Sequence, residues 1–440
     1  MASNQPLAAG EPSNKQLSKV AGPLLLWGVA VGAVISGDYY GWNAGLGQTG
    51  YWGYLIAIAV MGLLYAGLSA SIAELATAIP HSGGAYAYTR TALGRVWGFL
   101  AGTSVQMQFV FAPVAVALTT GAYVKILFPQ VPVLVSAALL YIGSTALHLM
   151  GAGGSLRVEF VFTAVATIGL VVFAIVGAPH ISIENLSAHS GGAVFPNGFG
   201  GLWATLPLAA WFFFAIESLP MSAEETRNPS KDIPRALIYA FLTLAVVGVA
   251  TLTVAAGVGG PDLANSDAPL ADALVKIVGQ QGWIVPAISI FAIASLIASF
   301  HAIVLAYSRQ TFALSRAEYL PSFLSILNKH HVPVWGTIVP GVIGFIFVIL
   351  GDTVLPDAIP VLVNLSVFAA AISYVLMTVS VIVLRRTKPD LERPVKVPGG
   401  PIIPGIAAVL AVLLIPAALV SFPIAFVIGV IVVALYLLYY

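Results

Sequence analysis

The sequence contains no cysteine and very little charge. Of its 440 residues, only 8% are Asp, Glu, Lys or Arg. The absence of cysteine excludes disulfides, thiolate catalysis and cysteine-ligated metals. An ordinary soluble domain carries about 25% charged residues, so this composition does not provide enough charge to cover a water-facing surface. The scarcity of charge therefore argues against a soluble enzyme and against a disordered regulator.

An excess of positive charge is also missing. The 18 Lys and Arg residues offset 17 Asp and Glu residues, which leaves a net charge of +1 and no basic surface for nucleic acid. Hydrophobic side chains, by contrast, make up 59% of the chain, and the mean hydropathy is +0.98. We therefore predict an integral membrane protein whose main partner is the lipid bilayer, with no nucleic-acid partner.

Long apolar runs divide the chain into about twelve candidate membrane spans. A helix that crosses about 30 Å of hydrocarbon needs about 20 mostly apolar residues. Runs of this kind lie near residues 22–46, 52–78, 96–126, 131–149, 158–177, 202–222, 235–258, 283–308, 335–351, 358–384, 401–420 and 422–439. The predicted fold class is therefore an all-α integral membrane protein.

The distribution of Lys and Arg selects an orientation for these spans. With residues 1–21 as a cytoplasmic N-terminal tail, sixteen of the 18 basic residues fall in cytoplasmic segments, and only Lys125 and Lys276 fall outside. Cytoplasmic loops of membrane proteins carry such an excess of positive residues. We predict a multi-pass protein of the cell inner (plasma) membrane with both termini in the cytoplasm.

Asp38 stands out because a carboxylate at the centre of a bilayer costs about 2.5–3.5 kcal/mol on insertion scales. It lies within the first predicted span, beside Ser36, Gly37 and Gly41, which are poor choices for an unbroken helix. Irregular backbone at this depth is tolerated where it lines a cavity or is buried in protein. We predict that Asp38 is an anionic site for a cation; the alternative is that it caps a helix half near the outer interface.

A second interruption is predicted in the sixth span. Glu217 follows an aromatic run and lies between Pro207 and Pro220, which weaken a helix. Interrupted helices at corresponding positions of two repeats point to the central site of a transporter. We predict a ten-helix inverted-repeat transport core over residues 22–396 and two additional transmembrane helices over residues 397–440.

Aromatic residues near these interruptions are candidates for a cage around an ammonium group, which gains about 0.5–2 kcal/mol over an aromatic face. Aromatic residues in membrane helices also serve simply as packing, and that alternative stays open. The candidates are Tyr39, Tyr40, Trp42, Trp211, Phe212 and Phe300, with His301 as a neighbour. No metal-ligand spacing, phosphate-binding loop or hydrolase motif is visible in the sequence. We therefore predict no enzyme activity, no cofactor and no metal.

Several segments resemble those of the amino acid–polyamine–organocation (APC) superfamily of transporters. Residues 80–88 (PHSGGAYAY) resemble the loop after the second helix of that family, and residues 214–217 and 223–235 resemble its sixth helix and cytoplasmic exit. Arg309 and residues 315–321 resemble the segment after its eighth helix. The resemblance covers nearly the whole chain. It implies a LeuT-like five-plus-five inverted repeat, with discontinuous helices 1 and 6 and two added helices.

The sequence departs from the family at the loop of helix one, where small residues normally bind the carboxylate of an amino acid. Here the loop reads Ser36-Gly37-Asp38, and its carboxylate would repel an anion and attract an ammonium. This departure, together with residues 37–43 and 217–221, looks most like the ethanolamine permease branch. The substrate-binding positions that we predict are Ser36, Gly37, Asp38, Tyr39, Tyr40, Trp42, Gln108, Phe111, Trp211, Phe212, Ala215, Phe300 and His301. The resemblance implies that Glu217 is the proton-responsive glutamate.

We therefore expect a secondary active transporter that imports a small amine cation, ethanolamine first, by alternating access. A proton is the expected coupling ion, although uniport driven by the membrane potential and exchange stay open. Sodium is less favoured: Ser295 and Ser299 of the eighth span could help to ligate it, but serines in a helix also bond to the backbone of their own helix. An amino acid or polyamine permease of the same fold is the first alternative. A membrane sensor that binds the amine without moving it is an alternative of a different class.

Overall fold

The computed structural model describes residues 21–188, 195–279, 282–354 and 357–440. Within these ranges the chain forms helices and no named β-strand, which confirms the predicted all-α fold. The α-helices are α1 (Pro23–Ile35), α2 (Ala44–Ala78), α3 (Ala85–Leu93), α4 (Arg95–Leu127), α5 (Val133–Leu149), α6 (Ala152–Gly177), α7 (Ile183–Ala188), α8 (Gly198–Ala210), α9 (Pro229–Gly259), α10 (Pro269–Val278), α11 (Ile284–Arg316), α12 (Val334–Thr353), α13 (Ala358–Thr387), α14 (Ile402–Ser421) and α15 (Pro423–Tyr439). Short 3-10 segments are η2 (Ser36–Asp38), η3 (Ala178–His180), η4 (Ile216–Glu225), η5 (Pro261–Asn265) and η6 (Ser322–Ser325).

The predicted spans correspond to the helices of the structure. Among the described residues, eight helices are long and apolar enough to cross a membrane, namely α2, α4, α6 with its η3 extension, α9, α11, α12, α13 and α14. Shorter apolar helices cover the first, fourth and last predicted spans. The remaining predicted span, 202–222, is formed by α8 and η4. The chain is therefore a multi-pass membrane protein.

The first span is broken, as predicted. Helix α1 ends at Ile35, one 3-10 turn covers Ser36–Asp38, and helical structure resumes at Ala44. The outer half of this span is short, because Gly50 has a non-helical conformation (φ 67°, ψ 176°) and turns the chain into the second span. Only glycine adopts such a conformation readily. As a result, α2 contains both the end of the first span and all of the second.

The sixth span is broken at the corresponding place. Helix α8 ends at Ala210, and η4 begins at Ile216. Between them, Ala215 has a left-handed conformation with φ 77°. A non-glycine residue in this region costs about 1–2 kcal/mol, and it persists where the surrounding structure fixes it. Both discontinuities expected from the sequence are therefore present.

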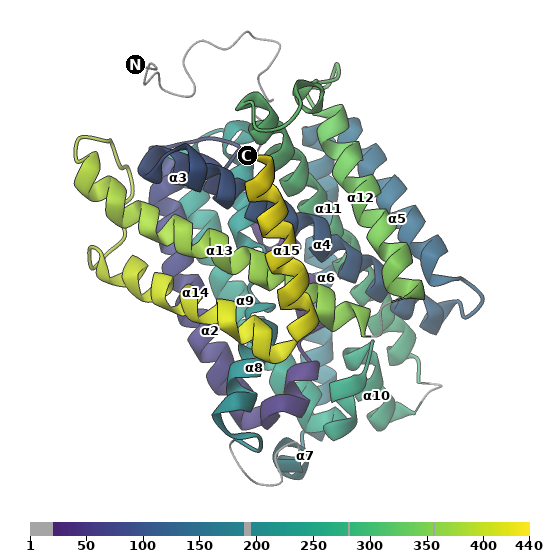
Figure 1. The fold of residues 1–440 in the computed structure, drawn as a ribbon. Helices are drawn as coiled ribbons and strands as arrows, with labels where there is room; N and C mark the ends of the chain where they lie inside the picture. The colour runs from purple at the N-terminus through teal and green to yellow at the C-terminus, as the bar shows by residue number, and fades with distance from the viewer. Residues whose placement is uncertain (1–20, 189–194, 280–281, 355–356) are drawn as a thin grey trace.

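The centre of the bundle is built from α4, α11 and α13. Between 72% and 78% of the apolar window of each of these helices is buried against other parts of the chain. Figure 1 shows α5 and α12 side by side at one edge, and α14 and α15 packed on α13. The Tyr440 ring lies 5.0 Å from that of Phe99, and the Ala21 N–H donates to Glu225 O at 2.9 Å. The first and last described residues thus lie at the same end of the bundle as α3, opposite α7 and α10 (Figure 1).

Candidate functional site

Asp38 is fully buried at the break in the first span. Its exposed fraction is 0%, and neither carboxylate oxygen has a hydrogen-bond partner among the described residues. The carboxylate points toward α9, where a Cβ atom at Gly248 would lie 3.3 Å from Asp38 Oδ1. Leaving a buried charge without a partner is costly. The position is therefore suited to a cation or a proton that the protein itself does not supply.

Aromatic residues from both breaks pack beside Asp38. The Trp42 Nε1–H donates to the Asp38 carbonyl at 3.0 Å, and the Trp42 ring lies 5.7 Å from that of Phe212. A Cβ atom at Gly248 would also lie 2.9 Å from Phe212 Cδ1, so this ring and the Asp38 carboxylate approach the same point of α9. Tyr39 extends in another direction and donates to Ala166 O of α6 at 2.8 Å. The structure thus brings two of the predicted aromatic residues, Trp42 and Phe212, close to Asp38.

The two broken helices touch through Trp211. A Cβ atom at Gly37 would lie 2.5 Å from Trp211 O, and one at Gly41 would lie 3.0 Å from Trp211 Nε1. Glycine is therefore required at Gly37 for this close approach. The Tyr40 ring meets the Trp211 ring edge-on at 5.9 Å. Gly37, Tyr40 and Trp211 thus form one buried contact between the breaks, and Ser36 is buried in the same 3-10 turn as Gly37.

Glu217 lies in a separate polar cluster just after the second break. Gln108 of α4 donates to Glu217 Oε1, and the Tyr374 hydroxyl of α13 donates to the same oxygen at 2.7 Å. Tyr65 of α2 lies 3.1 Å from Tyr374, hydroxyl to hydroxyl. Glu217 Oε2 has no partner among the described residues. The sequence predicts Gln108 as a substrate-binding position, and the structure places it on Glu217. The only sequence signal for the two tyrosines is that a buried hydroxyl needs a hydrogen-bond partner.

Three of the predicted site residues have their ring neighbours on other helices. Phe300 meets Tyr141 of α5 at 4.6 Å, and His301 stacks on His148 of α5 at 3.9 Å. Phe111 meets Phe347 of α12 at 4.9 Å. Successive residues of a helix point about 100° apart. Ser299 accordingly faces α1, where it donates to Ala33 O at 2.7 Å, while the next two residues, Phe300 and His301, contact α5.

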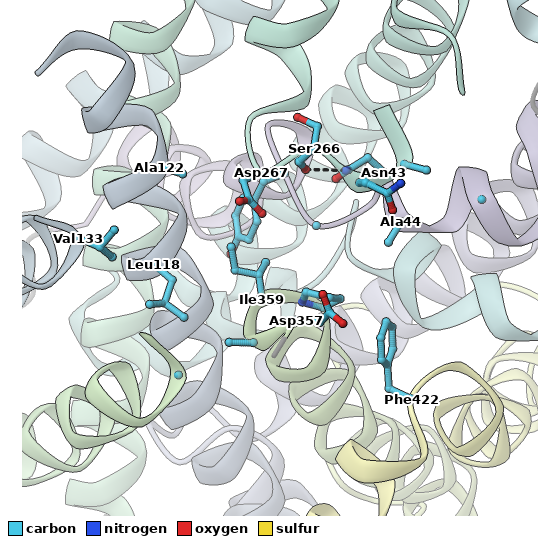
Figure 2. Close-up of a pocket in the computed structure, with 18 of the residues that line it drawn as sticks. Asn43, Ala44, Leu118, Ala122, Val133, Ser266, Asp267, Asp357, Ile359 and Phe422 are labelled. Atoms are coloured by element: carbon cyan, nitrogen blue, oxygen red, sulfur yellow. Dashed lines mark hydrogen bonds between the residues drawn. The ribbon is translucent and has the colours of Figure 1, made fainter. Parts of the chain in front are cut away.

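A cavity of about 700 Å³ is lined by Tyr40 and Gly41 of the first break and by residues of η5, the end of α4 and the start of α13. We call it the vestibule. Figure 2 shows residues that line it and labels ten of them. On one side of the vestibule, the Asn43 side chain donates hydrogen bonds to Leu263 O at 2.7 Å and to Ser266 O at 2.8 Å. The ionisable residues that line it are Lys125, Asp267, Asp352 and Asp357. The vestibule therefore borders the first break.

The acidic residues of the vestibule influence one another. Burial raises the pKa of Asp267, and the nearby Asp272 and Asp357 carboxylates raise it further. Three acids against one lysine give the vestibule a net negative charge at neutral pH. Such a cavity attracts cations and repels anions.

Ion pairs join the helices at the opposite end of the bundle. Arg309 of α11 pairs with Glu225 of η4 at 2.5 Å, and both side chains are buried. Arg316 pairs with Glu224 at 2.9 Å. Glu74 of α2 accepts hydrogen bonds from Arg385 of α13 and from the Val397 N–H at 2.7 Å. The vestibule therefore lies at one end of the bundle, and ion pairs connect the helices at the other end, which carries α3.

Comparison with known proteins gives a consistent result. The sequence profile of the family described as amino acid permease matches residues 26–440. The branched-chain amino acid permease BcaP of Bacillus subtilis is 28% identical over 433 residues, covering 93% of this chain and 90% of the relative. The aromatic amino acid transport protein AroP of Escherichia coli O6:H1 is 22% identical over 373 residues, covering 82% and 81%.

A solved structure is also similar over nearly the whole chain. It is the crystal structure of the Eremococcus coleocola manganese transporter in complex with an aromatic bis-isothiourea substituted compound. The TM-score is 0.61 at 14% sequence identity, and the match covers 98% of this chain and 97% of that chain. At this identity the likeness concerns the fold alone, and it agrees with the predicted LeuT-like arrangement with two broken helices.

Proposed function

The chain belongs to the amino acid permease family, a family of transporters rather than enzymes, and from that premise we propose that it imports a small amine cation, ethanolamine first. The observation that carries this proposal is Asp38. It is a fully buried carboxylate without a hydrogen-bond partner among the described residues, and it lies at the break of the first span. An ammonium group would supply the missing positive charge, and Trp42 and Phe212 offer aromatic faces beside it.

In this proposal, the substrate enters through the vestibule. Its acidic residues raise the local concentration of cations above Tyr40 and Gly41. Movement of Trp211 away from Gly37 then opens the way to Asp38. The substrate hydroxyl bonds to a backbone group that the breaks leave without a helical partner.

Glu217 is the proposed proton carrier. Its cluster joins α2, α4, η4 and α13 through Tyr65, Gln108 and Tyr374. Gaining or losing a proton at Glu217 would change these hydrogen bonds, and so couple protonation to the relative position of the helices. Rocking of a core over residues 22–396, with residues 397–440 as an appended pair of helices, would give alternating access.

The proposed location is the inner (plasma) membrane with both termini in the cytoplasm. The basic residues Arg90, Arg95, Arg316 and Arg385 all lie at the end of the bundle that carries α3. The positive-inside rule assigns that end to the cytoplasm. The vestibule then faces outward.

A second candidate is an amino acid permease, which the relatives favour because BcaP and AroP are named for branched-chain and aromatic amino acids. A zwitterion has an ammonium for Asp38 and a carboxylate for exposed N–H groups at the breaks. The same transport experiment separates the two candidates, since an amino acid would then compete with ethanolamine.

The test is uptake of labelled ethanolamine into proteoliposomes, with the membrane potential clamped and a pH gradient imposed or withheld. We expect Asp38→Asn to abolish saturable uptake and Glu217→Gln to remove its dependence on the pH gradient. Glu184→Gln, an exposed acid on α7, is the matched control and should behave like the wild type. Uptake of isoleucine or phenylalanine in place of ethanolamine would overturn the substrate and keep the family. Ethanolamine uptake that is unchanged in Asp38→Asn would overturn the role of Asp38.

A further inference from the structure

A second cavity, of about 250 Å³, lies at the end of the bundle opposite the vestibule. Its lining comes from the loop before α3, from α3 itself, from the start of α4 and from the end of α11. The residues are His81, Tyr86, Arg90, Arg95, Ala313, Arg316, Ala317 and Glu318. We call it the arginine pocket, because three guanidinium groups converge on it.

The charges of the arginine pocket do not cancel. Arg316 is paired with Glu224 at 2.9 Å, and Glu318, an exposed residue, is the one acid in the lining. Among the described residues, neither Arg90 nor Arg95 forms an ion pair. Counted over the described residues, the three arginines face two acids, Glu224 and Glu318.

The guanidinium groups of Arg90 and Arg95, which have no ion pair within the described part of the chain, rest against neutral tyrosines. Arg90 donates to the Tyr86 hydroxyl, and its Cζ lies 5.9 Å from the Tyr86 ring. Arg95 lies with its Cζ 5.8 Å from the Tyr319 ring. Tyrosine leaves the guanidinium charge uncompensated, so several N–H donors stay available for an anion.

His81 closes one side of the pocket without adding charge. Its Nδ1 accepts the Gly83 N–H at 2.8 Å. Burial lowers the pKa of His81 to about 4, with Arg316 and Arg90 acting in the same direction and Glu224 against it. At neutral pH the His81 ring is therefore uncharged, and the positive charge of the pocket comes from its arginines.

The pocket lies where α4 enters the bilayer. Val96 and Trp97 follow Arg95 directly, and they are 48% and 50% exposed on the outer surface of the bundle. Tryptophan at the start of a membrane helix is typical of the interface between hydrocarbon and headgroups. Basic pockets between membrane helices at the cytoplasmic face bind the headgroups of anionic lipids. We propose that the arginine pocket binds the phosphate of an anionic phospholipid headgroup, held by Arg90 and Arg95.

The test compares lipids on purified, delipidated protein in detergent. Thermal unfolding is followed while phosphatidylglycerol, phosphatidylcholine or inorganic phosphate is titrated. We expect phosphatidylglycerol to raise the unfolding midpoint at concentrations where phosphatidylcholine does not. Each arginine removed should weaken the apparent affinity about fivefold, so Arg90→Gln with Arg95→Gln should lose most of the effect.

The controls make the result specific to this pocket. Arg235→Gln with Arg386→Gln removes two exposed arginines that do not line the pocket, and it should keep the wild-type response. If the double variant does not fold, Arg95→Gln alone still tests the site, because Arg95 is exposed and its replacement should not disturb folding. Equal phosphatidylglycerol affinity in the wild type and in Arg95→Gln would overturn the site. If inorganic phosphate raises the unfolding midpoint as much as phosphatidylglycerol does, the pocket binds free phosphate and the lipid assignment is wrong.

Discussion

Gly248 shows how a single residue without a side chain shapes the candidate site. A Cβ atom there would lie 2.9 Å from Phe212 and 3.3 Å from the Asp38 carboxylate. Overpacking of this kind typically costs about 1–3 kcal/mol. We predict that Gly248→Ala raises the KM for the transported amine about tenfold and leaves kcat less affected, as measured by concentration-dependent uptake.

Gly405 of α14 is the matched control for this substitution, because no atom lies within 4 Å of the place its Cβ would take. Gly405→Ala should leave transport unchanged and stabilise the helix by about 0.5–1 kcal/mol. An unchanged KM in Gly248→Ala would show that the Asp38 carboxylate does not need this space.

His81 gives a prediction for the pH dependence of stability. The pKa of its buried ring is lowered to about 4, whereas an unfolded histidine titrates near about 6.5. Between these values the unfolded chain binds a proton that the folded protein does not, so stability falls as the pH drops through that window. At about 1.4 kcal/mol per pKa unit, the loss reaches about 3 kcal/mol.

The measurement is the thermal unfolding midpoint between pH 7 and pH 4. His81→Asn keeps an acceptor for the Gly83 N–H and removes the titration, so we expect a shallower pH dependence than in the wild type. His180→Asn, which changes an exposed ring, should retain the wild-type slope. Parallel slopes in all three proteins would contradict the assignment.

At the scale of elements, the Arg309–Glu225 pair ties α11 to η4 deep in the bundle. Removing one member of a buried pair leaves an uncompensated charge and costs about 3–5 kcal/mol, whereas replacing both members by apolar residues is much less costly. We predict a large fall in the unfolding midpoint for Arg309→Met and recovery of most of it in Arg309→Met with Glu225→Met. Equal midpoints in the single and double variants would exclude a direct pair.

The helix breaks were predictable because their signals are local. Gly37 and Gly41 mark the first break, and Pro207 and Pro220 flank the second. By contrast, α3 begins within residues 80–88, which the sequence identifies only as resembling a loop. This helix packs against α4 and α13, so tertiary contacts stabilise it. Short helices of this kind depend on packing more than on propensity.

In the candidate site, too, the residues with a local signal could be predicted, whereas their long-range partners could not. Asp38 and Trp211 are visible as a charge and an aromatic residue at breaks in apolar runs. The partnership of Glu217 with Tyr374 joins residues 157 positions apart, and no local pattern encodes such a contact. The direction in which Phe300 points is set by the rotation of α11 against α1 and α5, which hydropathy alone does not determine.

At the scale of the whole molecule, the lack of cysteine makes sidedness and movement directly measurable. Ala122 lines the vestibule, and Ala317 lines the arginine pocket at the other end. We predict that an impermeant maleimide added to intact cells labels Ala122→Cys but not Ala317→Cys, and that the reverse holds in inverted membranes. The wild type, with no cysteine, is the background control.

Transport makes a further prediction for the same variants. Alternating access closes the vestibule when the opposite end opens, so saturating substrate should slow the labelling of Ala122→Cys several-fold. Labelling of Ala122→Cys only from the inside would reverse the assigned orientation. A labelling rate that substrate does not change would argue for binding without movement, as in a sensor.

The direction in which the broken helices run has an electrostatic consequence of its own. The C-termini of α1 and α8, at Ile35 and Ala210, both lie at the breaks. The C-terminus of a helix carries the equivalent of about half a negative charge. The carbonyl end of α1 lies just before Asp38, and Trp211 O, just after the end of α8, lies against Gly37; these two negative dipole ends add to the Asp38 carboxylate, whereas the starts of α2 and η4 carry the opposite partial charge. A cation beside Asp38 would therefore gain free energy from these two carbonyl ends as well as from the carboxylate, and a carboxylate group would find its favourable dipoles at the facing helix starts, Ala44 and Ile216.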